Sequence, residues 1–216
     1  MTPTDDSNTF DTVTCSGLAV SHSPDLDGGG PRTWPHFIQT VRRHVGEQVN
    51  HAFEWCAGPG YIGFALLGAG LCNKLTLADI NPVAVAACRR TIEQNGLADR
   101  VTVYLSNNLA DIPDSERWDL VIGDPPHFRE ALPRHIERGF ELRSVDPDWS
   151  IHREFFRTLT PHLNPGARVL ISESRVAGNY DDLFTHMMTE AGLELVEPIW
   201  ELPEMRRYCL LGKWGG

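Results

Sequence analysis

Apolar runs of strand length alternate with segments of helical periodicity along most of the chain, and this alternation constrains the fold more than any other feature. Strands are expected at residues 51–56, 74–80, 101–107, 118–124, 167–174, 193–200 and 206–214. Helical patterns lie at residues 33–46, 61–70, 82–96, 149–163 and 181–192. Because right-handed crossovers between parallel strands place helices on both faces of a sheet, this order predicts a doubly wound α/β fold.

The two ends of the chain depart from simple alternation. Only residues 201–205 separate the last two apolar runs, which is too short for a helical crossover, so these runs are expected to pair antiparallel. Residues 1–46 are expected to form an N-terminal extension or lid with one short helix, capped by Thr33 and ended by Gly46, and residues 47–216 the main domain. For residues 1–32 two alternatives stay open, a disordered segment or a lid folded over a site.

Composition and charge argue against several kinds of partner. The formal net charge is −10 and the pI is about 5.3, and an acidic surface repels the phosphates of nucleic acids. The four arginines within residues 129–143 alternate with acidic residues, so we interpret that segment as a mixed, solvated one. We therefore expect a small-molecule substrate and regard nucleic acid as an unlikely partner.

Cysteine and histidine spacing gives no sign of a disulfide framework or a metal site. The five cysteines are an odd number without a C-x-x-C pair, and the nine histidines show no ligand spacing, so no metal is expected. The N-terminus lacks the basic start and apolar middle of a signal peptide, and no apolar run is long enough to span a bilayer. These features predict a cytoplasmic protein with no membrane partner.

A glycine-rich turn follows the first expected strand of the main domain. Gly58, Gly60 and Gly63 match the pattern G-x-G-x-x-G, which lets a backbone approach a ligand closely at the start of a helix. Asp79 ends the next strand, 19 positions after Gly60, where a carboxylate can accept both hydroxyls of an adenosine ribose. The pattern serves a nicotinamide dinucleotide and other adenosine-bearing cofactors equally well.

Two further features distinguish these possibilities. Glu54 lies inside the first strand just before the turn, where a ligand with an amino group favours a carboxylate and a pyrophosphate does not. The fourth strand ends in Asp124-Pro125-Pro126-His127, and two consecutive prolines present rigid carbonyl groups without N–H donors.

In this order, these motifs resemble those of the Rossmann-like (class I) S-adenosylmethionine-dependent methyltransferases, and most of all the small-domain branch with an [N/D]-P-P-[aromatic] motif after strand four. The resemblance covers about residues 48–216 and implies a Rossmann-like, seven-stranded, mostly parallel sheet with one antiparallel strand. It also implies that S-adenosyl-L-methionine is the cofactor of the domain at residues 47–216. The expected cofactor contacts are Glu54, Cys56, Ala57, Gly58, Gly60, Tyr61, Asp79, Ile80, Asn107, Asn108 and Asp124.

The same resemblance implies a role for the corner at residues 124–127. In the family, the first side chain and the following carbonyl accept hydrogen bonds from an N–H group and aim its lone pair at the methyl carbon. The expected substrate-binding residues are Pro125, Pro126, His127 and Phe128, and the expected catalytic residues are Asp124, His127 and Tyr180. This chain has Asp124 where the common residue is Asn and His127 where nucleic-acid-modifying members have a flat aromatic ring. The long segment 127–150 and Trp34 are expected to build the acceptor pocket.

These departures favour methyl transfer to a nitrogen or oxygen of a small metabolite. Three alternatives stay open. One is cyclisation of the cofactor with release of methylthioadenosine, as in azetidine-2-carboxylate synthases. The others are N-methylation of RNA or protein, and a non-catalytic cofactor-binding module.

Overall fold

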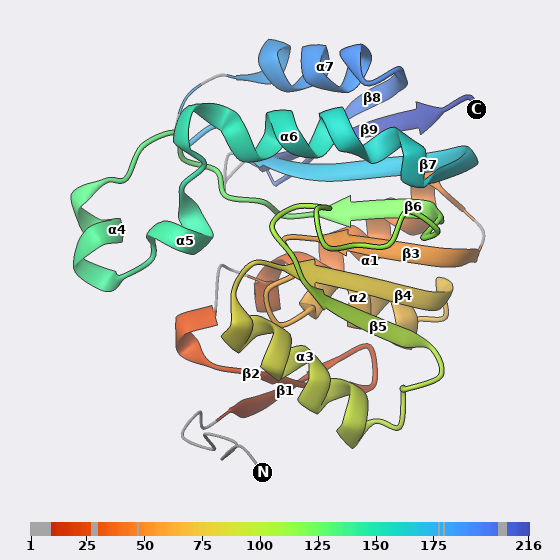
Figure 1. The fold of residues 1–216 in the computed structure, drawn as a ribbon, viewed down its shortest axis with the longest axis vertical. Helices are drawn as coiled ribbons and strands as arrows, with labels where there is room; N and C mark the ends of the chain where they lie inside the picture. Colours follow the sequence, from red (N-terminus) through yellow and green to blue (C-terminus); the bar gives the residue numbers. More distant parts are fainter. Residues whose placement is uncertain (1–9, 27–29, 47, 177, 179, 203–206) are drawn as a thin grey trace.

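The computed structural model describes residues 10–26, 30–46, 48–176, 178, 180–202 and 207–216. Seven strands form one sheet in the order β5-β4-β3-β6-β7-β9-β8 (Figure 1). Their bounds are β3 (Val49–Trp55), β4 (Cys72–Asp79), β5 (Val101–Leu105), β6 (Trp118–Gly123), β7 (Leu163–Ser174), β8 (Leu193–Leu202) and β9 (Arg207–Trp214). Only β9 runs against its neighbours β7 and β8, which confirms the expected sheet and its closing hairpin.

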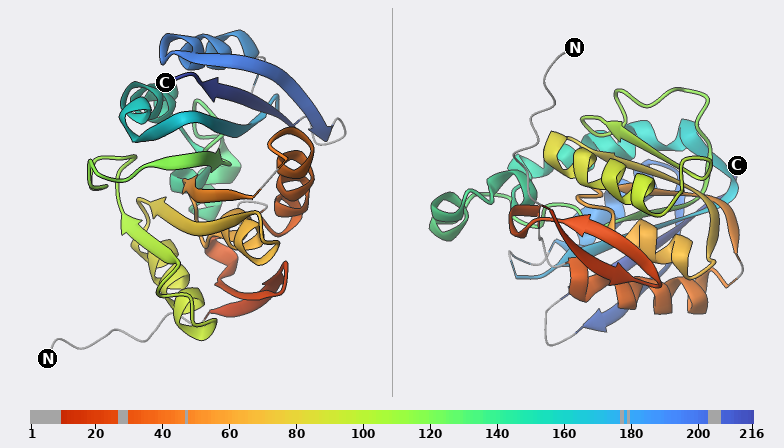
Figure 2. Two further views of the ribbon diagram at one scale, coloured as in Figure 1. Left: turned by 90° about the vertical axis from the view of Figure 1, so that its right-hand side faces the viewer. Right: turned by 90° about the horizontal axis from the view of Figure 1, so that it is seen from below.

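Helices cover both faces of this sheet (Figure 2). The helices α1 (Gly30–His44), α2 (Tyr61–Gly68) and α3 (Pro82–Gln94) contribute to one core, and α6 (Ser150–Leu159) and α7 (Asp181–Glu190) contribute to the other. Alternate side chains of β3 supply the two cores, since Ala52 belongs to the first and Phe53 and Trp55 to the second. None of the helices in the described ranges is long and apolar enough to cross a membrane.

Stacked rings fill much of the second core. Phe53 stacks on Trp118 with ring centroids 4.0 Å apart, and Trp55 stacks on Phe155 at 3.8 Å. Trp55, Trp118 and Phe155 are at most 1% exposed. Such large buried rings contribute strongly to burial free energy, so they hold β3, β6 and α6 in a fixed relation.

The N-terminal segment folds against the main domain. A hairpin of β1 (Asp11–Cys15) and β2 (Leu18–His22) is followed by the 3-10 turn η1 (Pro24–Leu26). The Ser21 amide donates to the Thr91 hydroxyl at 2.9 Å, and Cys15 and Val20 are fully buried in the first core. The described residues 10–26 are therefore folded, whereas residues 1–9 and 27–29 lie outside the described residues, and the role of a lid stays a prediction.

The helix that follows is longer than expected. It begins at Gly30 instead of Thr33, so Thr33 lies buried inside α1 and does not cap it. The buried side chains Phe37, Ile38 and Val41 bind α1 to the first core, so its length is set by tertiary packing more than by a local start signal.

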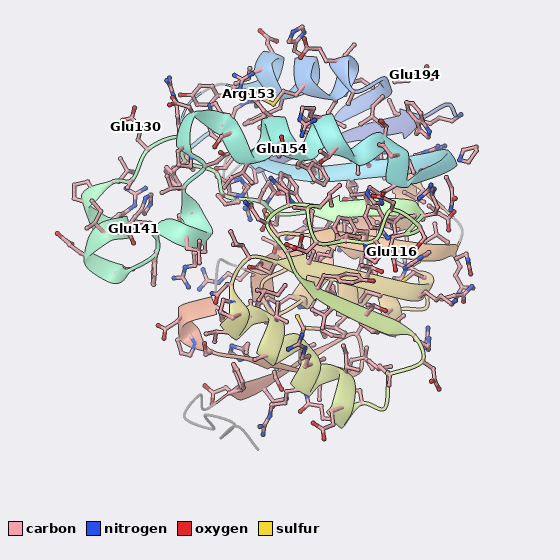
Figure 3. The ribbon with its side chains drawn as sticks, viewed as in Figure 1. Glu116, Glu130, Glu141, Arg153, Glu154 and Glu194 are labelled. Carbon is pink, nitrogen blue, oxygen red and sulfur yellow. The ribbon has the colours of Figure 1, made fainter. Side chains whose placement is uncertain are left out.

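An insertion separates β6 from α6. Residues 124–149 contain α4 (Pro133–Arg138), α5 (Glu141–Ser144) and the 3-10 turn η2 (Pro147–Trp149), and the 3-10 turn η3 (Thr160–His162) follows α6. This insertion projects from the edge of the sheet where the parallel strands end (Figure 1). Glu130 and Glu141 lie on it, whereas Glu116 lies toward the other end of the strands (Figure 3).

The docking of the hairpin gives a test. A Cβ atom at Gly68, the last residue of α2, would lie 2.5 Å from the backbone oxygen of Ser16 between β1 and β2. We expect Gly68→Ala to lower the free energy of unfolding by about 1–3 kcal/mol, because the clash exceeds the gain in helix propensity. Urea denaturation measures the change. Gly215→Ala, where an added Cβ meets nothing within 4 Å, is the control; equal midpoints for both variants would contradict the docked hairpin.

Candidate functional site

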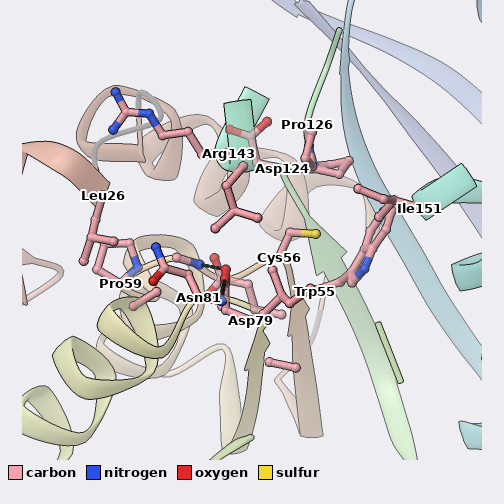
Figure 4. Close-up of a pocket in the computed structure, with 18 of the residues that line it drawn as sticks. Leu26, Trp55, Cys56, Pro59, Asp79, Asn81, Asp124, Pro126, Arg143 and Ile151 are labelled. Carbon is pink, nitrogen blue, oxygen red and sulfur yellow. Dashed lines mark hydrogen bonds between the residues drawn. The ribbon is translucent and has the colours of Figure 1, made fainter. Parts of the chain in front are cut away.

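A cavity of about 580 Å³ opens where β3, β4 and β6 end. In the sheet register, Trp55 of β3 lies beside Ala78 of β4 and Gly123 of β6, so the loops after these strands meet at one edge. The glycine turn after β3 and the Asp124 corner after β6 therefore face the same cavity (Figure 4). Its volume falls in the range of pockets that hold small ligands.

Asp79 connects the glycine turn to the end of β4. Its Oδ2 accepts a hydrogen bond from the Gly58 amide at 2.7 Å, and its Oδ1 accepts one from the Asn81 amide at 2.8 Å. Burial raises the pKa of Asp79, although these amides favour the ionised form. Gly58 and Gly60 have φ values of 53° and 78°, a region that glycine adopts without strain. The carboxylate thus holds the turn open toward the cavity.

Glu54 is the most deeply buried acid of the cavity wall. It is 2% exposed, and its Oε2 accepts a hydrogen bond from the Gly63 amide at 2.7 Å. A Cβ atom at Gly63 would lie 2.6 Å from that oxygen, so the third glycine of the motif makes room for the glutamate. Burial raises the pKa of Glu54 to about 8. A buried, largely neutral acid at a cavity wall is suited to a ligand with an ammonium group, which would favour its ionised form.

The other expected cofactor contacts occupy related positions. Of the expected set, Glu54, Cys56, Ala57, Gly58, Tyr61, Asp79, Ile80, Asn107, Asn108 and Asp124 line the cavity. Gly60 does not line it, but its amide donates to the Ala57 carbonyl and closes the turn.

Asn108 makes two hydrogen bonds within the protein. Its Oδ1 accepts from Trp55 Nε1 at 2.8 Å, and its Nδ2 donates to the Ile151 carbonyl at 3.2 Å. Of the two asparagines considered for the adenine ring, the exposed Asn107 is therefore the better candidate.

An arginine from β9, which is separated from β6 only by β7, binds the Asp124 corner. Arg207 at the start of β9 contacts Asp124 through Nη2–Oδ1 at 2.6 Å and Nη1–Oδ2 at 3.1 Å. His127 Nε2 lies 3.0 Å from Asp124 Oδ1, and Arg207 Nη2 also contacts that nitrogen. Burial opposes ionisation of Asp124, but Arg207 and His127 outweigh it and lower its pKa to about 2. Asp124 is therefore an anion at neutral pH.

Behind this corner lies a chain of buried acids and imidazoles. His127 Nδ1 lies 3.7 Å from Glu173 Oε2, and Glu173 Oε1 lies 3.0 Å from His152 Nε2. His152 Nδ1 lies 2.5 Å from Asp146 Oδ2, and His152, Glu173 and Asp146 are at most 1% exposed. Burial disfavours the imidazolium, but Glu173 and Asp146 outweigh it and raise the pKa of His152 to about 9. His152 is thus cationic between two carboxylates.

Some expected site residues lie elsewhere. Among the described residues, Phe128 and Tyr180 do not line the cavity. The Phe128 ring packs against His135 at 4.5 Å, and the Tyr180 ring packs against Trp149 at 4.9 Å, because the insertion folds its aromatic side chains on one another and on α7. These positions do not support the roles expected of Phe128 and Tyr180, which stay predictions. Trp34 likewise packs on the first core.

The wall of the cavity includes part of the segment 127–150, which was expected to build the acceptor pocket, and also residues that no sequence pattern marked. Residues 141–143 and 145 of the insertion face Asp25 and Leu26 of the N-terminal segment, and Arg143 Nη1 donates to the Asp25 carbonyl at 2.6 Å. Arg207 lies 83 positions from Asp124, and no local motif marks it. Asp146 does carry a local signal, since its carboxylate accepts from the amides of Ile151 and His152 at the start of α6.

Comparisons with known proteins agree with this geometry. Residues 37–139 match the family model of the methyltransferase small domain, a range that includes both the glycine turn and the Asp124 corner. The chain is 34% identical over 118 residues to the ribosomal RNA small subunit methyltransferase C of Shewanella pealeana, covering 55% of this chain and 31% of that protein. It is 27% identical over 130 residues to the release factor glutamine methyltransferase of Cereibacter sphaeroides, covering 56% and 45%. The chain thus spans less than half the length of these curated relatives.

A solved structure shows the same fold. The T. thermophilus 16S rRNA methyltransferase RsmC, in complex with AdoMet and guanosine, aligns with a TM-score of 0.66 at 13% identity. The alignment covers 95% of this chain and 50% of that one.

These relatives correct the expectation of a small-metabolite acceptor and of an unlikely nucleic-acid partner. The first three curated relatives are all ribosomal RNA small subunit methyltransferases C. The expectation depended on the net charge of −10, which is a sum over every face of the molecule. Such a sum does not determine what one edge of a sheet binds.

The raised pKa of Glu54 predicts how stability depends on pH. The pKa of Glu54 is about 8 in the folded chain and about 4.5 in an unfolded one, so the folded state binds the extra proton between these values. Stability should therefore fall as pH rises from 5 to 8, by up to about 1.4 kcal/mol per pH unit from this group. Glu54→Gln should remove that part of the slope, as urea unfolding at each pH would show. The exposed Glu93→Gln is the control, and parallel curves for wild type and Glu54→Gln would refute the assignment.

Proposed function

We propose that the chain is a class I S-adenosylmethionine-dependent methyltransferase, with S-adenosyl-L-methionine as cofactor, and that it methylates a nitrogen of RNA. The observation that carries the proposal is the 34% identity over 118 residues to an enzyme named for ribosomal RNA. The relative named for a glutamine substrate is more distant, at 27% identity, so RNA is favoured over protein.

The cavity wall suits the three parts of the cofactor. The buried Glu54 carboxyl would face the amino group, while the positive end of the α2 dipole would favour the carboxylate. Asp79 accepts one hydrogen bond from Gly58 of the turn and one from the Asn81 amide, and it retains lone pairs for the ribose hydroxyls. Ile80, 48% exposed at the cavity, would contact the adenine ring, and Asn107 its amino group.

The Asp124 corner would hold the acceptor. Asp124 is ionised and acceptor-only, and Pro125 lacks an N–H, so the corner presents hydrogen-bond acceptors to the amino group of a nucleobase. Arg207 occupies the Asp124 oxygens in this structure. An entering amino group would therefore take the place of a guanidinium N–H on Asp124, so Asp124 keeps a hydrogen-bond donor throughout.

Catalysis would depend mainly on positioning. The bound cofactor supplies a methyl group already activated by its sulfonium sulfur. Holding a nucleophile in line with such a group can contribute roughly 7–11 kcal/mol to rate enhancement. The glycine turn and the Asp124 corner lie at the ends of adjacent parallel strands, which fixes the distance between the two reactants. A base in duplex or stacked RNA would have to turn out of its stack to enter the cavity.

Cofactor binding can be tested separately from methyl transfer. Asp79→Asn replaces one acceptor oxygen by an amide and removes the charge. We expect the Kd for S-adenosylhomocysteine to rise about 10- to 100-fold in calorimetry, the range for a lost charged hydrogen bond. The exposed Asp99→Asn should bind as the wild type does. Unchanged affinity in Asp79→Asn would place the ribose elsewhere.

The acceptor is tested with labelled cofactor and small ribosomal subunits or their purified RNA. We expect label in the RNA, with equimolar S-adenosylhomocysteine, and a methylated base after nuclease digestion. Asp124→Ala should lower kcat at least about 100-fold, because it removes the group that orients the acceptor, while Asp99→Ala should not. Label in the protein fraction would contradict an RNA acceptor. Methylthioadenosine as the sulfur product would show cyclisation of the cofactor instead.

A further inference from the structure

The corner at residues 124–127 continues inward as an unbroken series of ionisable groups. Asp124, His127, Glu173, His152 and Asp146 follow one another, each with an atom within 3.7 Å of the next. They come from the end of β6, the end of β7, α6 and the residue before η2. Buried charges are costly unless paired, so a series this deep calls for a reason beyond stability.

The two ring nitrogens of His127 face different partners. Arg207 Nη2 contacts both Nε2 and Asp124 Oδ1, which lie 3.0 Å apart. A guanidinium can only donate hydrogen bonds, so with Arg207 as the donor to both acceptors Nε2 presents its lone pair. In a neutral ring the proton then lies on Nδ1, which faces Glu173 Oε2 at 3.7 Å. In the described part of the chain, neither Nδ1 nor Oε2 has any other hydrogen-bond partner. Both atoms are therefore directed at each other.

His152, fixed by Asp146, holds Glu173 in place and favours its ionised form. His152 donates to its other oxygen at 3.0 Å and is itself fixed by Asp146, whose carboxylate also accepts the His152 amide at 3.0 Å. Burial opposes ionisation of Glu173, but His152 and His127 outweigh it and lower its pKa. Glu173 and its two supporting side chains are buried, so the support is rigid.

Charged groups surround His127 on several sides. The groups that face it directly are Asp124 on its own corner, Glu173 from β7 and Arg207 from β9. Counting His152 and Asp146 behind Glu173, three carboxylates surround one guanidinium and one imidazolium. With His127 neutral, the formal charges of the cluster therefore sum to minus one.

We propose that His127 Nε2 accepts the proton released by the acceptor nitrogen during methyl transfer, and that Glu173 is the positioning residue that keeps the other ring proton on Nδ1. This inference rests on the proposed function. A nitrogen–carbon bond forms as the carbon–sulfur bond breaks, and the electron pair of the broken bond neutralises the sulfonium. The acceptor nitrogen then loses its N–H proton to Nε2, which lies 3.0 Å from the Asp124 oxygen that would bind that N–H group. His152 and Asp146 stay in place and fix Glu173, as a carboxylate fixes the imidazole of a catalytic triad.

The tautomer can be measured without any acceptor. Histidine ring 15N–1H correlation spectra of the protein with S-adenosylhomocysteine, assigned with His127→Asn, show which nitrogen carries the proton. We expect Nδ1–H for neutral His127 in the wild type, and loss of that preference in Glu173→Gln. A wild-type ring with its proton on Nε2 overturns the proposal, whether or not any variant folds.

Kinetics test the same residue by a second readout. The acceptor is the unmodified RNA that the wild-type protein methylates. With it, Glu173→Gln should lower kcat about 10- to 1,000-fold and change the pH profile of kcat, while the KM for the cofactor stays within about twofold. Glu116→Gln is the matched control. Glu116 accepts hydrogen bonds from Tyr104, Thr76 and Trp118, and it lies away from the insertion (Figure 3).

The outcomes separate this inference from the proposed function. If RNA is not methylated at all, the proposed function fails, while the 15N spectra still decide the position of the ring proton. If RNA is methylated and Glu173→Gln keeps the wild-type kcat and pH profile, the positioning role is wrong. A loss of kcat of equal size in Glu116→Gln would show that the effect reports stability alone.

Discussion

The parallel pairing of β3 with β4 on one side and β6 on the other is the interaction on which the site depends. Parallel strands end at the same edge, so Glu54, Asp79 and Asp124 are brought to one cavity by three separate segments of sequence. The stacked rings of Phe53, Trp118, Trp55 and Phe155 lock these strands and α6 together from one face. Neither the glycine turn nor the Asp124 corner has a function without that alignment.

Acids at this edge have different protonation states because their neighbours differ. Glu54 has no cation beside it in the described residues, and burial raises its pKa to about 8. Asp124 is also sequestered, but Arg207 and His127 lower its pKa to about 2. The cavity wall therefore combines a largely neutral acid, suited to a positive ligand group, with a permanent anion, suited to an N–H donor.

The replacement of a flat aromatic by His127 takes on a different meaning once the fold is known. From the motif alone, an imidazole in place of a stacking ring argued for a small acceptor. In the structure the imidazole is one member of a buried series that ends at Asp146, and the relatives are named for RNA. A series of acids and imidazoles can position a proton, and it gives no information about the size of the acceptor.

Local pattern and order along the chain were enough to predict the seven-stranded sheet, the closing hairpin, the glycine turn with Asp79, and the Asp-Pro-Pro-His corner. Each depends on periodicity, turn residues or adjacency within a few positions, which a linear sequence records directly. Only the tertiary structure decided four other features. These are the ion pair of Arg207 with Asp124, the contact of Glu173 with His127, the docking of the hairpin on α2, and the position of Tyr180 outside the cavity. These contacts join residues far apart in the chain or reflect how aromatic side chains share space, and neither property leaves a periodic trace in sequence.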